Sequence, residues 1–300
     1  MKFHLKSAAK VNLTLDILNR REDGYHELAS IVHTIGIWDE IDIEIIPDGE
    51  VSFTCSRVDL AGLDNLCVKA VKKWNEATGE NVGAKIHLEK RIPTGAGLGG
   101  GSGNAAAILL ALNRASHNPI AEEKLSEIGA KLGADVPLFL AGGAVLMEGI
   151  GEKLTIMARK SGWLLIIKPE KSFSTPEIYR VWDEQKRFSG NATAQMLADW
   201  HRVSISKVAA NLGNDLQSAA SSISGLPRVC SQLLRECGAI GAQMSGSGSA
   251  CFGLFESEND AKIAAEKLRV ELAKDVQLHQ SQLFVAPFCA QGVEFAPQNV

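Results

Sequence analysis

The sequence predicts an α+β fold in two lobes, and three observations support this prediction. Residues 11–18 and 40–46 alternate between apolar and polar side chains, which is typical of strands with one buried and one wet face. A glycine-rich segment over residues 95–103 leads into an alanine- and leucine-rich helix over residues 104–114. A change in composition near residues 157–162 separates this part from a second lobe. The first lobe is therefore expected to hold an antiparallel-rich sheet.

The remaining elements follow from local periodicity. Apolar residues at helical spacing predict helices, and short apolar or alternating runs between turns predict strands. We expect a first domain over residues 1–158 and a second domain over residues 159–300. The further predicted elements are, in chain order, strand 51–55, helix 66–78, strand 85–90, helix 120–132, strand 163–167, helices 193–200, 215–222 and 226–237, strand 250–255, helix 260–272 and strand 283–287.

Composition and charge exclude several classes of protein. Of 300 residues, 45% are hydrophobic and 22% are charged, which is ordinary for a globular chain. The net charge of −4 comes without a basic patch, so we expect no nucleic-acid partner. The most apolar run, residues 136–147, is too short to span a bilayer, and the N-terminus lacks the apolar stretch of a signal peptide. We expect a cytoplasmic protein without a membrane partner, either a monomer or a weak homodimer.

The cysteines give no sign of a metal site or a disulfide framework. They lie at positions 55, 67, 230, 237, 251 and 289, and none forms a C-x-x-C pair. A zinc site or a thioredoxin-type motif is therefore not indicated. The chain is also large enough to fold without disulfides. We interpret the cysteines as reduced, mostly buried thiols.

The segment from Pro93 to Asn104 is typical of a phosphate-binding loop. Six of the nine residues from Gly95 to Gly103 are glycine, which lets backbone N–H groups approach an anion closely. The helix that follows adds free N–H groups and the positive end of its dipole. A flexible linker is disfavoured, because the segment lies between a predicted strand and a predicted helix.

Two common nucleotide-binding motifs do not explain this loop. A Walker A loop requires G-K-[ST], and no lysine occurs between Pro93 and Arg114. Gly95, Gly97 and Gly100 match the dinucleotide fingerprint literally. However, the preceding strand is amphipathic rather than buried on both faces, and no second strand ending in an acidic residue follows. The remaining possibility is a strand, a glycine-serine loop and a helix in an antiparallel setting.

The pattern P-x-G-x-G-L-G-G-G-S-x-N-A-A resembles the phosphate loop of the galactokinase, homoserine kinase, mevalonate kinase and phosphomevalonate kinase superfamily. Further segments are similar, in the same order, to one family of that superfamily, the 4-diphosphocytidyl-2-C-methyl-D-erythritol kinases. Gly103 is a departure, because the loop more often has a second serine there. The segments that carry the resemblance are Ala9-Lys10-Val11-Asn12-Leu13, Arg21-Glu22-Asp23-Gly24-Tyr25-His26-Glu27-Leu28, Gly133-Ala134-Asp135-Val136-Pro137, Glu148-Gly149-Ile150-Gly151-Glu152, Gly213-Asn214-Asp215-Leu216 and Met244-Ser245-Gly246-Ser247-Gly248-Ser249.

This resemblance implies a two-lobed small-molecule kinase with an N-terminal nucleotide-binding lobe and a ferredoxin-like C-terminal lobe. It implies transfer of the ATP γ-phosphoryl group to the 2-hydroxyl of 4-diphosphocytidyl-2-C-methyl-D-erythritol, in the non-mevalonate route to isoprenoid precursors. Mg²⁺ would accompany ATP, and the substrate would lie between the lobes. Two alternatives remain open. One is a kinase of the same superfamily that acts on a smaller alcohol such as homoserine or mevalonate, and the other is a non-catalytic nucleotide sensor.

Asp135 and Lys10 are the candidate catalytic residues under this resemblance. A carboxylate would accept or orient the proton of the attacking hydroxyl, and a nearby ammonium would keep that carboxylate ionised. Local sequence alone favours other interpretations. Asp135 precedes Val136-Pro137, where it could cap a helix, and Lys10 could be a surface residue on a strand edge.

The resemblance also implies binding residues. A neutral imidazole and an aromatic ring suit the edge and the face of a cytosine, but Tyr25 and His26 could instead anchor a turn. Asn65 could lie near the adenine or cap a helix, and residues 245–249 could form a wall over the substrate or a plain turn. The expected substrate contacts are Asn12, Tyr25, His26, Thr175 and Tyr179. The expected ATP contacts are Asn65, Pro93, Gly95, Gly97, Leu98, Gly99, Gly100, Gly101, Ser102 and Gly103, and no metal ligand is assigned.

Overall fold

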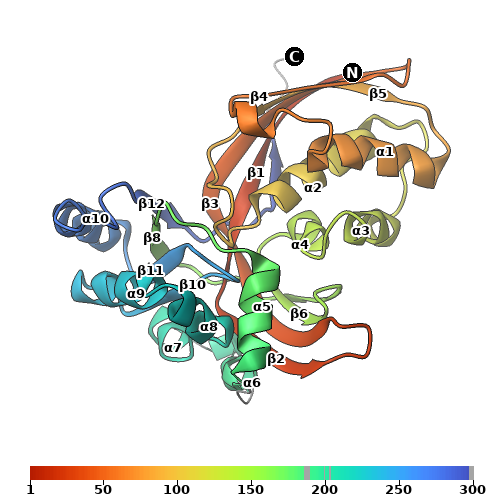
Figure 1. Cartoon of the computed structure of the whole chain (residues 1–300). Coiled ribbons are helices and arrows are strands. Elements are labelled where there is room, and N and C mark those ends of the chain that lie inside the picture. The colour runs from red at the N-terminus through yellow and green to blue at the C-terminus, as the bar shows by residue number, and fades with distance from the viewer. Residues whose placement is uncertain (186–189, 199, 203, 297–300) are drawn as a thin grey trace.

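The computed structural model describes residues 1–185, 190–198, 200–202 and 204–296. Its elements form two lobes, each built on one sheet with helices packed against it (Figure 1). This arrangement confirms the predicted α+β class with two sheets. The predicted boundary between residues 158 and 159 stays a prediction, and two short strands from the later part of the chain join the first sheet.

The first sheet contains nine strands within the described residues, and β3 is its longest. β3 pairs with β1 and β2 along one side and with β5 and β6 along the other. This long strand therefore links the two ends of the lobe. The strands of this sheet are β1 (Lys2–Asn12), β2 (Thr14–Arg20), β3 (His26–Ile46), β4 (Val51–Cys55), β5 (Gly83–Glu89), β6 (Ala144–Gly149), β7 (Lys153–Met157), β9 (Gly213–Asn214) and β13 (Val293–Phe295).

Four helices cover one face of the first sheet (Figure 1). They are α1 (Leu66–Thr78), α2 (Gly100–Ala115), α3 (Glu122–Ala130) and α4 (Val136–Ala141). α1 has the predicted bounds, and it ends at Gly79, whose φ of 76° suits glycine. The apolar stripe of α1, with Trp74 fully buried, packs into the core of the lobe. A short 3-10 helix, Val58–Leu60, precedes α1.

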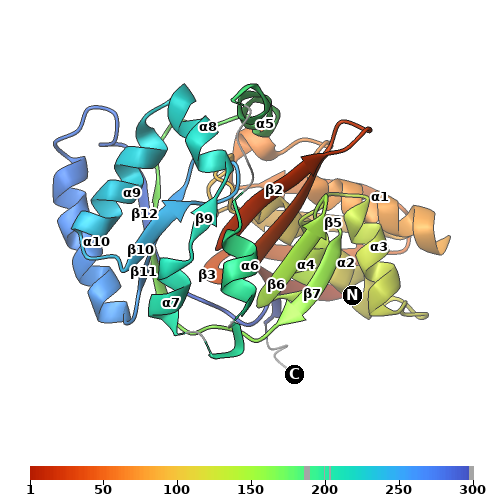
Figure 2. The same cartoon turned by 90° about the horizontal axis from the view of Figure 1, so that it is seen from below.

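The second sheet has the strand order β10-β11-β8-β12, and all of its pairs are antiparallel. α9 packs against β10 and β11, while α10 packs against β8 and β12 (Figure 2). α5 lies at the junction of the lobes, beside the β2–β3 hairpin (Figure 1). The elements of this part are β8 (Trp163–Lys168), α5 (Thr175–Glu184), α6 (Ala192–Ala198), a 3-10 turn (Trp200–Arg202), α7 (Ile205–Ala210), α8 (Leu216–Ile223), α9 (Leu226–Glu236), β10 (Gly241–Met244), β11 (Cys251–Phe255), α10 (Glu258–Leu272) and β12 (Gln282–Pro287).

Two predictions about the elements near the site need correction. The helix expected over residues 104–114 already begins at Gly100, because Gly99 ends the loop with a φ of 70° and the following glycines are helical. The strand expected over residues 11–18 is two strands, and its polar face is not wet. Asn12, Thr14 and Asp16 are buried, because the second lobe covers that face and supplies hydrogen-bond partners to it.

The cysteines agree with the interpretation from sequence. All six are free thiols, four of them buried and two half-buried. Burial raises the pKa of the Cys67 thiol to about 12, so this side chain is a neutral part of the core.

Candidate active site

The glycine-rich loop lines a cavity of about 320 Å³ next to the N-terminus of α2. Gly97 has a φ of 73°, and a Cβ there would lie 2.2 Å from the carbonyl oxygen of Ser245. Both the backbone conformation and the available space therefore require glycine at this position. Since α2 begins at Gly100, its first N–H groups have no partner within the helix and are available to an anion.

Nine of the ten predicted ATP contacts line this phosphate-loop cavity, and Gly103 is the exception. Gly103 lies on the buried side of α2, where a Cβ would come within 2.9 Å of the carbonyl oxygen of Ala8. Asn65 also lines the cavity, but its side chain caps α1. Its Oδ1 accepts a hydrogen bond from the N–H of Cys67 at 3.0 Å, and its Nδ2 donates to the carbonyl of Leu60. The helix-cap interpretation of Asn65 is thus observed.

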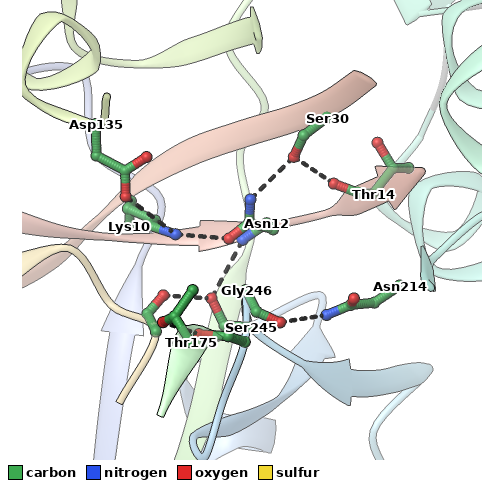
Figure 3. A network of polar contacts seen from close by, with 11 residues as sticks. Lys10, Asn12, Thr14, Ser30, Asp135, Thr175, Asn214, Ser245 and Gly246 are labelled. Carbon is green, nitrogen blue, oxygen red and sulfur yellow. Dashed lines mark hydrogen bonds and ion pairs between the residues drawn. The ribbon is translucent and has the colours of Figure 1, made fainter. Parts of the chain in front are cut away.

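Lys10 and Asp135 meet between the loop and the second lobe. Lys10 Nζ lies 3.5 Å from Oδ2 of Asp135 and donates a 2.6 Å hydrogen bond to Oδ1 of Asn12 (Figure 3). Lys10 is only 5% exposed, so it is not a surface lysine. Asp135 precedes α4 but makes no side-chain cap to it, and one third of its side chain is exposed. The structure therefore shows neither a helix-capping Asp135 nor a surface Lys10, but an ion pair whose carboxylate is accessible.

A chain of hydrogen bonds holds Asn12 in place beside this pair. Asn12 Nδ2 donates to Oγ of Ser30 at 2.9 Å, and Ser30 Oγ donates to the carbonyl of Thr14 (Figure 3). The N–H of Asn12 donates to Oγ of Ser245, which donates to the carbonyl of Gly97. The segment 245–249 is therefore fastened both to β1 and to the phosphate loop.

A second cavity, of about 390 Å³, opens over the ion pair and is called the catalytic cavity below. Strand β1, the phosphate loop, the start of α4, α5 and the segment 245–249 all contribute to its walls. The segment 245–249 is therefore a wall of this cavity, which is one of the two interpretations that the sequence allowed. The predicted site residues that line it are Lys10, Asn12, Gly95, Gly97, Gly99, Ser102, Asp135, Thr175 and Tyr179.

A third cavity, of about 640 Å³, continues from the catalytic cavity between the β2–β3 hairpin and α5, and is called the α5 pocket below. Thr175 and Tyr179 line both cavities, while Tyr25 and His26 line the α5 pocket alone. Tyr25 is 63% exposed. Tyr179 is stacked on His26, with ring centroids 4.9 Å apart. Burial, together with the nearby charge of Asp135, raises the pKa of Tyr179 to about 12, so its phenol is neutral.

Sequence reasoning missed the buried ion pair beneath the phosphate loop. Lys90 Nζ donates to Oδ2 of Asp39 at 2.6 Å and to the carbonyl of Ile92 at 2.7 Å. Oδ1 of Asp39 accepts from the N–H groups of Arg91 and Ile92, both at 2.7 Å. Burial lowers the pKa of Lys90, and the charge of Asp39 opposes this effect. Little in the sequence indicated this pair, because a lysine at a strand end normally lies at the surface.

Sequence reasoning also missed Asp183, which accepts from His26 in the α5 pocket at 2.7 Å. Asp183 follows Tyr179 by four residues, so the two share a face of α5. This spacing could have indicated the residue, but no helix was predicted there.

Within the described ranges, no group of three or more His, Cys, Asp or Glu side chains is placed to hold a metal ion. No helix among these residues is long and apolar enough to cross a membrane.

Family models match the two parts of the chain separately. Residues 65–143 match the N-terminal domain of the GHMP kinases, and residues 203–274 match the C-terminal domain of the GHMP kinases. The first match contains the phosphate loop and Asp135, and the second contains the segment 245–249.

Similar proteins cover nearly the whole chain. The 4-diphosphocytidyl-2-C-methyl-D-erythritol kinase of Alkaliphilus metalliredigens (strain QYMF) is 40% identical over 280 residues, which are 92% of this chain and 96% of that protein. The enzyme of the same name from Desulfitobacterium hafniense (strain Y51) is 41% identical over 266 residues, 86% of this chain and 89% of that protein. A crystal structure of 4-(cytidine 5'-diphospho)-2C-methyl-D-erythritol kinase superposes with a TM-score of 0.79 at 32% identity, covering 97% of this chain and 100% of the other. A homoserine kinase from Cytophaga hutchinsonii shares the fold at 17% identity, with a TM-score of 0.73 over 98% and 97% of the two chains.

Proposed function

This chain belongs to the GHMP kinases and, within them, to the 4-diphosphocytidyl-2-C-methyl-D-erythritol kinase family, and we propose that it phosphorylates the 2-hydroxyl of 4-diphosphocytidyl-2-C-methyl-D-erythritol. It is an ATP-dependent small-molecule kinase of isoprenoid precursor synthesis. The observation that carries the proposal is the Lys10–Asp135 pair, which lies where the phosphate-loop cavity and the catalytic cavity adjoin.

Asp135 acts on the attacking hydroxyl in this proposal. Its accessible carboxylate accepts the hydroxyl proton or orients it toward the γ-phosphoryl group. Lys10 Nζ, 3.5 Å away, adds positive charge beside the transferred group. The 2.6 Å hydrogen bond to Asn12 holds the ammonium in this position.

The nucleotide is bound by backbone groups in this proposal. The loop glycines and the first N–H groups of α2 hold the phosphates, and Ser102 adds a hydroxyl. Asp135 is the single acidic side chain among the described residues that line the phosphate-loop cavity and the catalytic cavity. So few carboxylates fit a Mg²⁺ ion that would keep several waters and would be held mainly by the nucleotide phosphates, whose charge it would neutralise.

The cytidyl group of the substrate lies in the α5 pocket in this proposal. The catalytic cavity and the α5 pocket are continuous through Thr175 and Tyr179, which suits an extended molecule with a polyol at one end and a base at the other. His26 offers a polar edge and the exposed ring of Tyr25 offers a stacking surface. A small alcohol would leave this 640 Å³ pocket empty.

An ADP-release assay tests the proposal. The cytidyl substrate should be turned over, whereas homoserine and mevalonate should not, and a preference for either small alcohol would overturn the proposed substrate. Asp135→Asn should keep ATP binding and lower kcat by roughly 10²–10⁴-fold, the usual contribution of acid–base catalysis. Asp42→Asn is the matched control, because Asp42 is an exposed aspartate on β3 outside the three cavities. Near-normal turnover by Asp135→Asn would contradict the role given to Asp135.

A further inference from the structure

Asp183 joins the second lobe to the base end of the site. Its Oδ1 lies 2.7 Å from Nε2 of His26, and its Oδ2 lies 3.5 Å from a guanidinium nitrogen of Arg20. His26 and Arg20 are directly opposite each other on β3 and β2. All three side chains line the α5 pocket.

Two aromatic residues fix the orientation of the His26 ring. Tyr179 is stacked on it at 4.9 Å with an interplanar angle of 29°, and Trp182 meets it edge-on at 5.8 Å. The His26 side chain is 7% exposed. The ring therefore cannot turn freely, and its two nitrogens have different surroundings.

Asp183 decides which nitrogen of His26 carries the proton. An ionised carboxylate only accepts hydrogen bonds, so Nε2 must be the donor. In the neutral imidazole, Nδ1 is then an acceptor. Within the part of the chain that the structure describes, Nδ1 has no hydrogen-bond partner. The fully buried side-chain nitrogen and oxygen atoms that lack a partner in this part are Oγ of Ser231 and Oγ of Ser281, so Nδ1 is not fully buried. Nδ1 therefore remains accessible to a ligand.

We propose that Asp183 is a positioning residue that makes the enzyme select cytosine over uracil by holding His26 in the tautomer whose Nδ1 accepts. The proposal rests on the proposed function, in which the base lies in the α5 pocket. Cytosine presents an amino group at position 4, which can donate to Nδ1, whereas uracil presents a carbonyl oxygen there. Two acceptors that face each other cannot form a hydrogen bond, and this disfavours uracil.

The substitution Asp183→Asn tests this selection. Arg20 can only donate, so it should draw the amide oxygen of the new side chain and leave the amide NH₂ to face Nε2 of His26. Nε2 must then accept, and the proton moves to Nδ1. A carboxylate-to-amide change that leaves a histidine in the wrong tautomer is known to disable catalytic sites without altering their geometry.

The expected result is a change in base preference. For the cytidyl substrate, kcat/KM should fall by roughly 10–100-fold, the usual effect of leaving one polar group of the ligand without its hydrogen-bond partner. For the same substrate with uracil in place of cytosine, kcat/KM should be unchanged or higher. The KM for ATP should not change. The matched control is Glu177→Gln, which removes a carboxylate from the exposed first turn of α5 and should leave the ratio of the two substrates as in the native enzyme.

Two further measurements keep the test decisive. In a His26→Ala background, Asp183→Asn should no longer alter the preference between the two bases, because its effect passes through His26. On the native enzyme, ¹⁵N chemical shifts of His26 should show that the neutral ring carries its proton on Nε2 and not on Nδ1, and this measurement does not depend on the folding of the variant.

An unchanged ratio of cytidyl to uridyl turnover in folded Asp183→Asn, or a protonated Nδ1 in the native enzyme, would overturn the role of Asp183. Failure of the native enzyme to use the cytidyl substrate at all would instead overturn the proposed function.

Discussion

Replacing Asp39 by alanine should destabilise the first lobe and displace the start of the phosphate loop. Asp39 is fully buried and accepts three hydrogen bonds of 2.6–2.7 Å, from Lys90 Nζ and from the N–H groups of Arg91 and Ile92. The alanine variant would leave a buried ammonium without its counter-charge and two N–H groups without that acceptor. Breaking one partner of such a pair costs about 3–5 kcal/mol. This is a large share of a typical stability of about 5–15 kcal/mol.

Urea unfolding followed by tryptophan fluorescence would measure this loss. Asp42→Ala is the matched control, because Asp42 lies on the same strand but its side chain is 64% exposed and forms an ion pair with the half-exposed His4. The control should lose about 0.5 kcal/mol or less. The KM for ATP should rise only in Asp39→Ala, since Arg91 and Ile92 directly precede the loop. Equal losses of unfolding free energy in the two variants would refute the reasoning.

The charge and the acceptor role of Asp39 can be separated with Asp39→Asn. Burial already lowers the pKa of Lys90, and removal of the carboxylate should lower it further. The unfolded chain then binds more protons than the folded chain in the alkaline range, so the stability of Asp39→Asn should rise with pH there. A pH-independent deficit relative to the native protein would show that Lys90 is not left as an uncompensated charge.

Two further predictions concern stability. Burial lowers the pKa of His33 to about 4, so between about pH 4 and 6.5 the unfolded state binds more protons than the folded state. About 3 kcal/mol of stability should therefore be lost as the pH falls through this window. Urea midpoints at several pH values should show a smaller loss in His33→Gln, and the same dependence of the midpoint on pH in both proteins would contradict this. Gly97→Ala should lower the unfolding free energy by about 2–4 kcal/mol, because its Cβ would meet the Ser245 carbonyl at a φ of 73°. Thermal melts measure this loss. The control is Gly101→Ala, whose Cβ has ordinary contacts in α2 and which should be nearly neutral. Similar melting temperatures for the two variants would argue against this packing.

The residues predicted at the phosphate-loop end of the site lie together in the structure, because glycine patterns and the resemblance act locally. The bounds of α1 and the position of the phosphate loop came from spacing alone. The burial of Lys10 could not be predicted in this way, since a single strand does not reveal what covers its polar face. The same reason explains Asn12, Thr14 and Asp16, which alternate like a wet face but contact the second lobe.

The base side of the site was predicted less completely. Tyr25 and His26 were identified as a pair, yet they differ in the structure: the ring of Tyr25 is exposed, while that of His26 is packed under Tyr179. Asp183 was missed because its partner lies 157 positions earlier in the chain. Contacts of this kind depend on how the two lobes meet, which local periodicity does not encode.

The last strand of the chain has a consequence for synthesis on the ribosome. β13 pairs with β1 through Leu5–Phe295, Lys6–Glu294 and Ser7–Val293, and the N–H of Ala8 donates to the carbonyl of Gly292. During synthesis β1 therefore emerges long before β13, the strand that pairs with its outer edge. A nascent or prematurely terminated chain presents that open edge to its neighbours, and such edges are sites of aggregation. Synthesis of β13 is thus what covers the open edge of the strand that carries Lys10.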